Sequence, residues 1–157
     1  KLRGQIGNVF PRIYIYKHLI PSFAMPEFYN SFDCLISTSY GEGFGLPHLL
    51  MMSCSKAVIS TPWSAMKDYM THENSLPIPY SIEETLYEIV KQDKNFFKHK
   101  WAVPSYEGLK EMMIWTVSNK KDMTEIGRKA RETVINMYSL PVVKEHMQTY
   151  LKKQNWL

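Results

Sequence analysis

The sequence predicts an α/β fold in which helices cover a parallel sheet and a helical tail follows. Continuous apolar runs at 33–38 and 56–61 are typical of strands that are buried on both faces of a parallel sheet. Stretches with helical spacing separate these runs, as in a doubly wound, Rossmann-like arrangement. A glycine-rich turn at 39–45 joins the first of these strands to the next helix.

The first half of the chain alternates between strand and helix patterns. A β-branched and aromatic run at 12–17 predicts a strand before the two buried ones. Pro77 and Pro79 place the last strand at a sheet edge, because proline cannot donate to a central ladder. In order, the expected elements are strand 12–17, helix 25–32, strand 33–38, helix 46–54, strand 56–61, helix 65–70 and strand 75–80.

The second half is predicted to be helical throughout. Ser81 and Glu84 have the spacing of a capping box, which opens a helix that ends near residue 92. Ser105 is expected to cap a second helix, and further helices are expected at 122–137 and at 139–154. We therefore expect one domain over 1–157, with an α/β part at 1–80 and a mainly helical part at 81–157.

Composition indicates a globular chain with a core of its own. Of the 157 residues, 45% are hydrophobic and 22% are charged, which excludes a disordered tail or a coiled coil. No apolar run approaches the roughly 20 residues of a membrane span, so we expect no membrane insertion, while peripheral association stays open. The formal net charge of +4 suits anionic ligands but is too small to indicate nucleic-acid binding.

Two further features bear on location and completeness. Cys34 and Cys54 stand inside apolar segments, which predicts buried thiols in a reducing, cytoplasmic compartment. Two lone cysteines without clustered histidines do not predict a metal site, and no cofactor is expected. The chain begins at Lys1 without an initiator methionine, which favours a fragment of a longer protein or a chain whose start has been removed.

The turn at 39–47 is the segment whose residues most clearly indicate a ligand-binding site. Its three glycines allow a sharp turn and a close approach to the backbone, and the N-terminus of the following helix attracts an anion such as a diphosphate. Glu42 would repel phosphate, so its better partners are the hydroxyl groups of a sugar. The alternative is a tight connection between a strand and a helix, with Glu42 merely exposed.

This stretch resembles the motif of the retaining GT-B-fold glycosyltransferases of family four. The most specific part of the resemblance is Glu-Gly-Phe-Gly-Leu-Pro at 42–47. Other similar segments lie at 29–33, 57–61, 63–64, 101–105, 109–113, 127–132 and 138–139. The resemblance implies the nucleotide-sugar-binding, C-terminal half of such an enzyme, without its first strands.

The resemblance also implies roles for particular residues. Glu42 corresponds to the residue that holds the hydroxyls of the donor sugar, which makes it the candidate catalytic residue. The backbone of Gly43, Phe44, Gly45 and Leu46 corresponds to the segment that faces the donor phosphates and sugar. Tyr16, Lys17 and His18 are candidates for the loop against the nucleobase. The implied reaction is the transfer of a hexosyl group from a UDP- or GDP-sugar to an acceptor. The acceptor would be bound by an N-terminal half, which is either a missing domain or a separate chain.

Leu50 is the clearest departure from the family pattern. The family has a second glutamate there, which binds the nucleotide ribose, and an apolar side chain cannot replace its hydrogen bonds. This departure favours an alternative function, a non-catalytic GT-B-like interaction module. Three other residues have two interpretations each: His48, Trp63 and Ser64 either reach the ligand or serve in packing.

Overall fold

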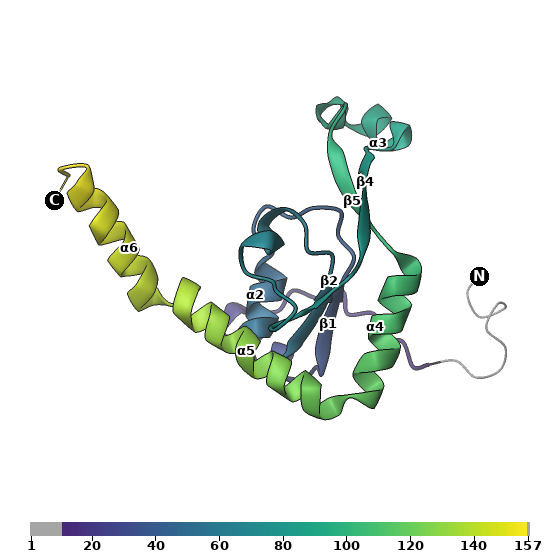
Figure 1. Ribbon diagram of the computed structural model, residues 1–157, viewed down its shortest axis with the longest axis horizontal. Coiled ribbons are helices and arrows are strands. Elements are labelled where there is room, and N and C mark those ends of the chain that lie inside the picture. The colour runs from purple at the N-terminus through teal and green to yellow at the C-terminus, as the bar shows by residue number, and fades with distance from the viewer. Residues whose placement is uncertain (1–10, 157) are drawn as a thin grey trace.

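The computed structural model describes residues 11–156 and shows a small parallel sheet between layers of helices (Figure 1). The α/β part contains, in order, α1 (Met25–Asn30), β1 (Cys34–Ser37), α2 (Leu46–Ser53), β2 (Ala57–Ser60), the 3-10 helix η3 (Ser64–Asp68) and β3 (Leu76–Pro77). The strands pair in parallel in the order β1-β2-β3. This confirms the Rossmann-like α/β class that the apolar runs predict.

Neighbouring residues of β2 point to opposite faces of the sheet, and each face has its own apolar cluster. Val58 packs with Met51 and Met52 of α2 on one face. Ile59 packs on the other face, against side chains of α4 (Tyr106–Ser118) and α5 (Lys120–Tyr138). Figure 1 shows α2 and α4 on opposite sides of the sheet, as burial of both faces requires.

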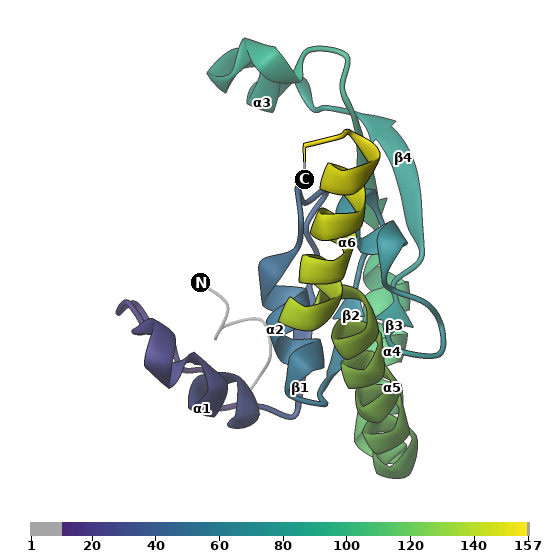
Figure 2. The ribbon, with the colours of Figure 1, turned by 90° about the vertical axis from the view of Figure 1, so that its left-hand side faces the viewer.

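The C-terminal helices begin close to where the sequence places them. Ser105 caps α4, since its Oγ accepts a hydrogen bond of 3.1 Å from the Gly108 N–H. The last helix, α6 (Leu140–Lys153), projects away from the sheet in Figure 1, and Figure 2 shows the domain from the side on which this helix lies. None of its residues is buried. Among the helices of residues 11–156, none is long and apolar enough to cross a membrane.

The expected helix at Ser81 is wrong. Residues Tyr80–Glu84 form β4, which pairs antiparallel with β5 (Lys100–Pro104), and the helix α3 is confined to Tyr87–Gln92. The Ser81 hydroxyl donates to the Glu83 carboxylate at 2.6 Å, so the serine does not cap a helix. The five residue pairs of the β4–β5 ladder outweigh a cap worth about 1 kcal/mol.

The expected strand at 12–17 is also wrong. A strand needs a neighbour for its backbone hydrogen bonds, and the described sheet offers no partner to this segment. Its apolar side chains are exposed accordingly, with Tyr14 at 84% and Ile15 at 77%. The expectation of buried thiols fails in part, because Cys34 and Cys54 are both only half-buried and free.

Candidate functional site

The loop between β1 and α2 depends on a glycine at its last position. Gly45 is the N-cap of α2 and has a left-handed backbone (φ 74°, ψ 44°). It is buried, and a Cβ added there would lie 2.3 Å from the Tyr69 hydroxyl oxygen. Pro47 stands in the first turn of α2, where no N–H is needed. The sharp turn that the sequence predicts is therefore made at Gly45.

The backbone N–H groups at this turn are left without partners. Within the part of the chain that the structure describes, the N–H groups of Gly43, Phe44, Gly45 and Leu46 donate no hydrogen bond. The space beside the Gly43 Cα is open, since no atom of residues 11–156 lies within 4 Å of an added Cβ. Consecutive free N–H groups at the N-terminus of a helix form a site that attracts anions.

The carbonyl groups of the same loop are held by the segment that follows β2. The Glu42 carbonyl accepts hydrogen bonds from the Ser64 hydroxyl at 2.8 Å and from the Ala65 N–H at 3.3 Å. The Tyr69 hydroxyl donates to the Phe44 carbonyl at 3.1 Å. The loop is thus held through its carbonyl groups, while its N–H groups stay available to a ligand.

The Glu42 side chain is half-buried and is in none of the ion pairs found in residues 11–156. Burial above all, and then the neighbouring Tyr138 hydroxyl and the carboxylates of Glu42 and Asp68, raise the pKa of the Tyr69 hydroxyl. Tyr69 therefore keeps its proton at neutral pH and remains a hydrogen-bond donor to the loop. The carboxylate of Glu42 is left with its oxygens available to hydroxyl groups.

His48 has a packing role. It is buried in the first turn of α2, and its Nε2 lies 2.9 Å from the Ser60 hydroxyl, which joins α2 to β2. Burial lowers the pKa of His48 in spite of the Glu42 charge, so the ring is neutral at pH 7. Its Nδ1 and the Thr61 hydroxyl are buried without a hydrogen-bond partner among the described residues. A neutral, buried ring does not supply positive charge to a phosphate.

Aromatic rings border the loop on the side of the β4–β5 hairpin, which sequence reasoning missed. The Ala102 N–H of β5 donates to the Tyr40 carbonyl at 3.1 Å, and the Tyr40 and Trp101 rings lie 5.6 Å apart. The Trp63 and Tyr80 rings lie 5.8 Å apart, and Trp63 is the side chain nearest to Gly41. The short run Trp-Ala-Val-Pro at 101–104 was the sequence signal for this strand.

The other candidate residues lie elsewhere. Tyr16, Lys17 and His18 are exposed before α1, where Tyr16 packs against His18 and Phe28. No hydrogen bond or ring contact between described residues brings them to the 42–46 loop, and their role stays a prediction. Leu50 is half-buried on α2, in the turn that follows His48.

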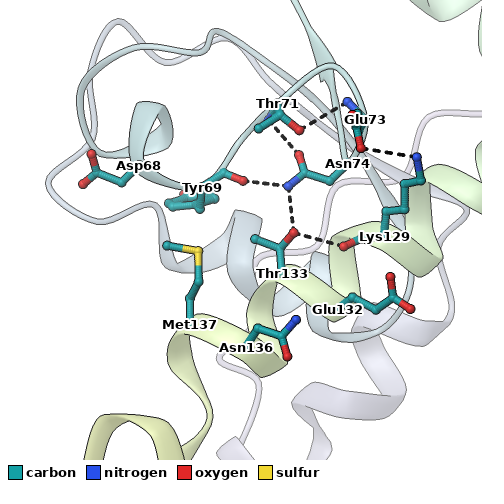
Figure 3. Close-up of a pocket in the computed structure, with 10 residues that line it drawn as sticks. All are labelled: Asp68, Tyr69, Thr71, Glu73, Asn74, Lys129, Glu132, Thr133, Asn136 and Met137. Atoms are coloured by element: carbon teal, nitrogen blue, oxygen red, sulfur yellow. Dashed lines mark hydrogen bonds and ion pairs between the residues drawn. The ribbon is translucent and has the colours of Figure 1, made fainter. Parts of the chain in front are cut away.

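A separate polar pocket of about 390 Å³ lies between α5 and the segment after η3 (Figure 3). Asn74 is at its centre. Its Nδ2 donates to the Tyr69 carbonyl and to the Thr133 hydroxyl, and its Oδ1 accepts from the Thr71 N–H. Its polar groups therefore stabilise the loop that carries Tyr69. In residues 11–156 no three His, Cys, Asp or Glu side chains are grouped to hold a metal ion.

Comparison with known proteins identifies the family. The family model of glycosyl transferases group 1 matches residues 1–92, which is more than half of the 157-residue chain and includes the whole 42–46 loop. A comparison with curated proteins found no match. The family match confirms the resemblance of the Glu-Gly-Phe-Gly-Leu-Pro motif to GT-B-type glycosyltransferases. The chain therefore belongs to the glycosyl transferases of group 1.

Proposed function

We propose that this chain binds a nucleotide diphosphate sugar at the 42–46 loop and takes part in transferring its hexosyl group to an acceptor. The observation that carries the proposal is the row of unpaired N–H groups from Gly43 to Leu46, at the N-terminus of α2. A diphosphate supplies the acceptor oxygens that these groups lack. Membership of the glycosyl transferases of group 1 supports a sugar donor of this kind.

Glu42 distinguishes a sugar donor from a simple phosphate. A carboxylate beside the anion site repels phosphate, whereas it accepts hydrogen bonds from two hydroxyl groups of one sugar ring. The neighbouring aromatic rings, Tyr40, Trp63, Tyr80 and Trp101, offer apolar surface to the same ring. Glu42 thus orients the donor sugar, while the loop N–H groups hold the diphosphate.

The chemistry of transfer rests on positioning and on charge. As the bond from the sugar to the diphosphate breaks, negative charge grows on the leaving oxygen. Fixed N–H groups stabilise that charge without having to reorganise. UDP and GDP are the expected leaving groups. A cytoplasmic location, the lack of a metal and the lack of a further cofactor stay predictions.

The acceptor is expected to be held by an N-terminal half, present as a further domain or as a separate chain. The exposed face of α6 supports such a partner, because its apolar side chains lie on one side of the helix and are not covered. Leu140 is 85% exposed, Met147 60% and Tyr150 59%. An exposed apolar stripe on an otherwise polar helix is typical of a docking surface.

Leu50 favours a second candidate function, a non-catalytic module that keeps the fold and binds a partner. Position 50, which binds the nucleotide ribose in the family, is a leucine in this chain, and its side chain is half-buried within the domain. The two candidates differ in one respect, the binding of a donor.

Calorimetric titration with UDP, GDP, UDP-glucose and GDP-mannose tests the proposal. We expect saturable binding that prefers one base. Glu42→Ala should weaken binding of the sugar conjugate by about ten- to a hundredfold, because it removes hydrogen bonds of a charged acceptor to the sugar. It should not weaken binding of the bare nucleotide, since the lost carboxylate repels phosphate. No binding by the folded chain at millimolar nucleotide would support the non-catalytic module instead.

A further inference from the structure

The peptide group between Glu42 and Gly43 links the two sides of the loop. Its carbonyl oxygen belongs to Glu42 and its N–H to Gly43, and in a planar trans peptide the two point in opposite directions. The group that holds the carbonyl therefore also sets the direction of the N–H. Here the carbonyl is held by Ser64 Oγ at 2.8 Å and by the Ala65 N–H at 3.3 Å, from the segment after β2.

Ser64 adopts an uncommon backbone conformation to make this contact. Its φ is 60°, in the left-handed region where non-glycine residues are disfavoured. The residue is exposed, and its hydroxyl has one hydrogen bond within residues 11–156, the one to Glu42. Glycine would adopt this backbone more easily, so packing does not account for the serine. Such local strain is typical of residues that serve a site.

We propose that Ser64 is a positioning residue for the donor: through the Glu42 carbonyl it aims the Gly43 N–H at the diphosphate. This inference rests on the proposed function and extends it to a residue outside the loop. In the planar trans peptide the Gly43 N–H points away from Ser64. The space beside the Gly43 Cα is also open, since none of the described residues comes within 4 Å of an added Cβ. Ala65 holds the same carbonyl only through its backbone, which leaves the Ser64 hydroxyl as the side chain that fixes the peptide.

Two substitutions separate this role from a merely structural one. Ser64→Ala removes the hydroxyl and keeps the unfavourable backbone, whereas Ser64→Gly removes the hydroxyl and relieves the backbone. We expect the melting temperature of Ser64→Gly to exceed that of Ser64→Ala by about 2–4 °C. Both variants should bind the donor equally weakly, because both lack the hydrogen bond.

The measurement is calorimetry on the full chain with UDP, GDP, UDP-glucose and GDP-mannose, beside thermal unfolding of the same samples. Each Ser64 variant should bind the preferred diphosphate and its sugar conjugate about three- to tenfold more weakly than the wild type does. Glu42→Ala is the matched contrast, since it should weaken binding of the conjugate but not of the bare diphosphate.

Three outcomes would count against the inference. Unchanged affinity in both Ser64 variants would overturn it while leaving the donor site standing. Affinity that follows stability, with Ser64→Gly binding like the wild type, would show a structural role only and would also overturn it. A wild-type chain that binds none of the four nucleotides would overturn the proposed function and this inference together.

Discussion

Replacing Gly45 with alanine is expected to destabilise the chain by about 2–4 kcal/mol. Alanine disfavours the left-handed backbone at this position, and its methyl group would clash with buried side chains. The added methyl group would lie 2.3 Å from the Tyr69 hydroxyl oxygen and 3.2 Å from both His48 Nδ1 and Met66 Sδ. Tyr69 also holds the Phe44 carbonyl, so moving its ring disturbs the loop as well. Urea unfolding followed by circular dichroism measures the loss.

Gly43→Ala is the matched control in the same loop. Gly43 does not share the positive φ of Gly45, and its side is open, so stability should stay within about 0.5 kcal/mol of the wild type. Its methyl group would nevertheless stand where the diphosphate approaches, and donor binding should weaken. Equal stability of the Gly45 and Gly43 variants would contradict the described turn.

Replacing Gly127 with alanine is expected to cost at least about 2 kcal/mol, although alanine is the better helix former. Gly127 is buried in α5, and an added Cβ would lie 2.1 Å from the carbonyl oxygen of Ser55 and 3.3 Å from the backbone nitrogen of Lys56. These are backbone atoms of the turn between α2 and β2, which cannot rotate away as a side chain can. The helix would have to move off the sheet.

Thr124→Ala provides the comparison on the same helix. Thr124 is exposed, and among the described residues its hydroxyl bonds only to the Lys120 carbonyl one turn earlier, so its loss should change the unfolding midpoint little. If Gly127→Ala proved as stable as Thr124→Ala in urea, α5 would not pack against the Ser55 turn as described.

The layered α/β part was predictable because its signals are local and agree with one another. Val58 and Ile59 stand in a run that is apolar on both faces, and Ser105 has the spacing of a cap. The glycine-rich turn was predictable for the same reason, since Gly45 and Pro47 each have a conformational reason to be there. Where local conformational preferences agree with the fold in this way, the fold can be predicted from the sequence.

The hairpin was not predictable from local pattern. Ser81 has the spacing of a capping box, but it lies in the strand β4. Pairing of β4 with β5, some twenty residues later in the chain, favours the strand over the helix. The run at 12–17 shows the reverse case, in which strand-forming residues find no ladder partner among the described strands. In both segments the presence or absence of a strand partner determines the structure. Local periodicity and residue propensity do not specify that partner.

The motif of the candidate site was visible in the sequence, but the residues that hold the loop were not. Glu42 and the glycines are adjacent in sequence, so their motif was visible. Ser64 and Tyr69 hold the loop from 22 and 25 residues away, through backbone carbonyls that carry no residue-specific signal. Only the fold brings them together.

The central claim, that the free N–H groups of the 42–46 loop bind the donor diphosphate, is tested most directly by amide NMR. The ¹⁵N-labelled chain is titrated with UDP-glucose and with GDP-mannose. The donor that carries the preferred base should shift the amide resonances of Gly43, Phe44, Gly45 and Leu46 more than the other amide resonances of the chain. Shifts confined to the pocket between Asn74 and α5, or no shifts at millimolar donor in the folded chain, would contradict the account.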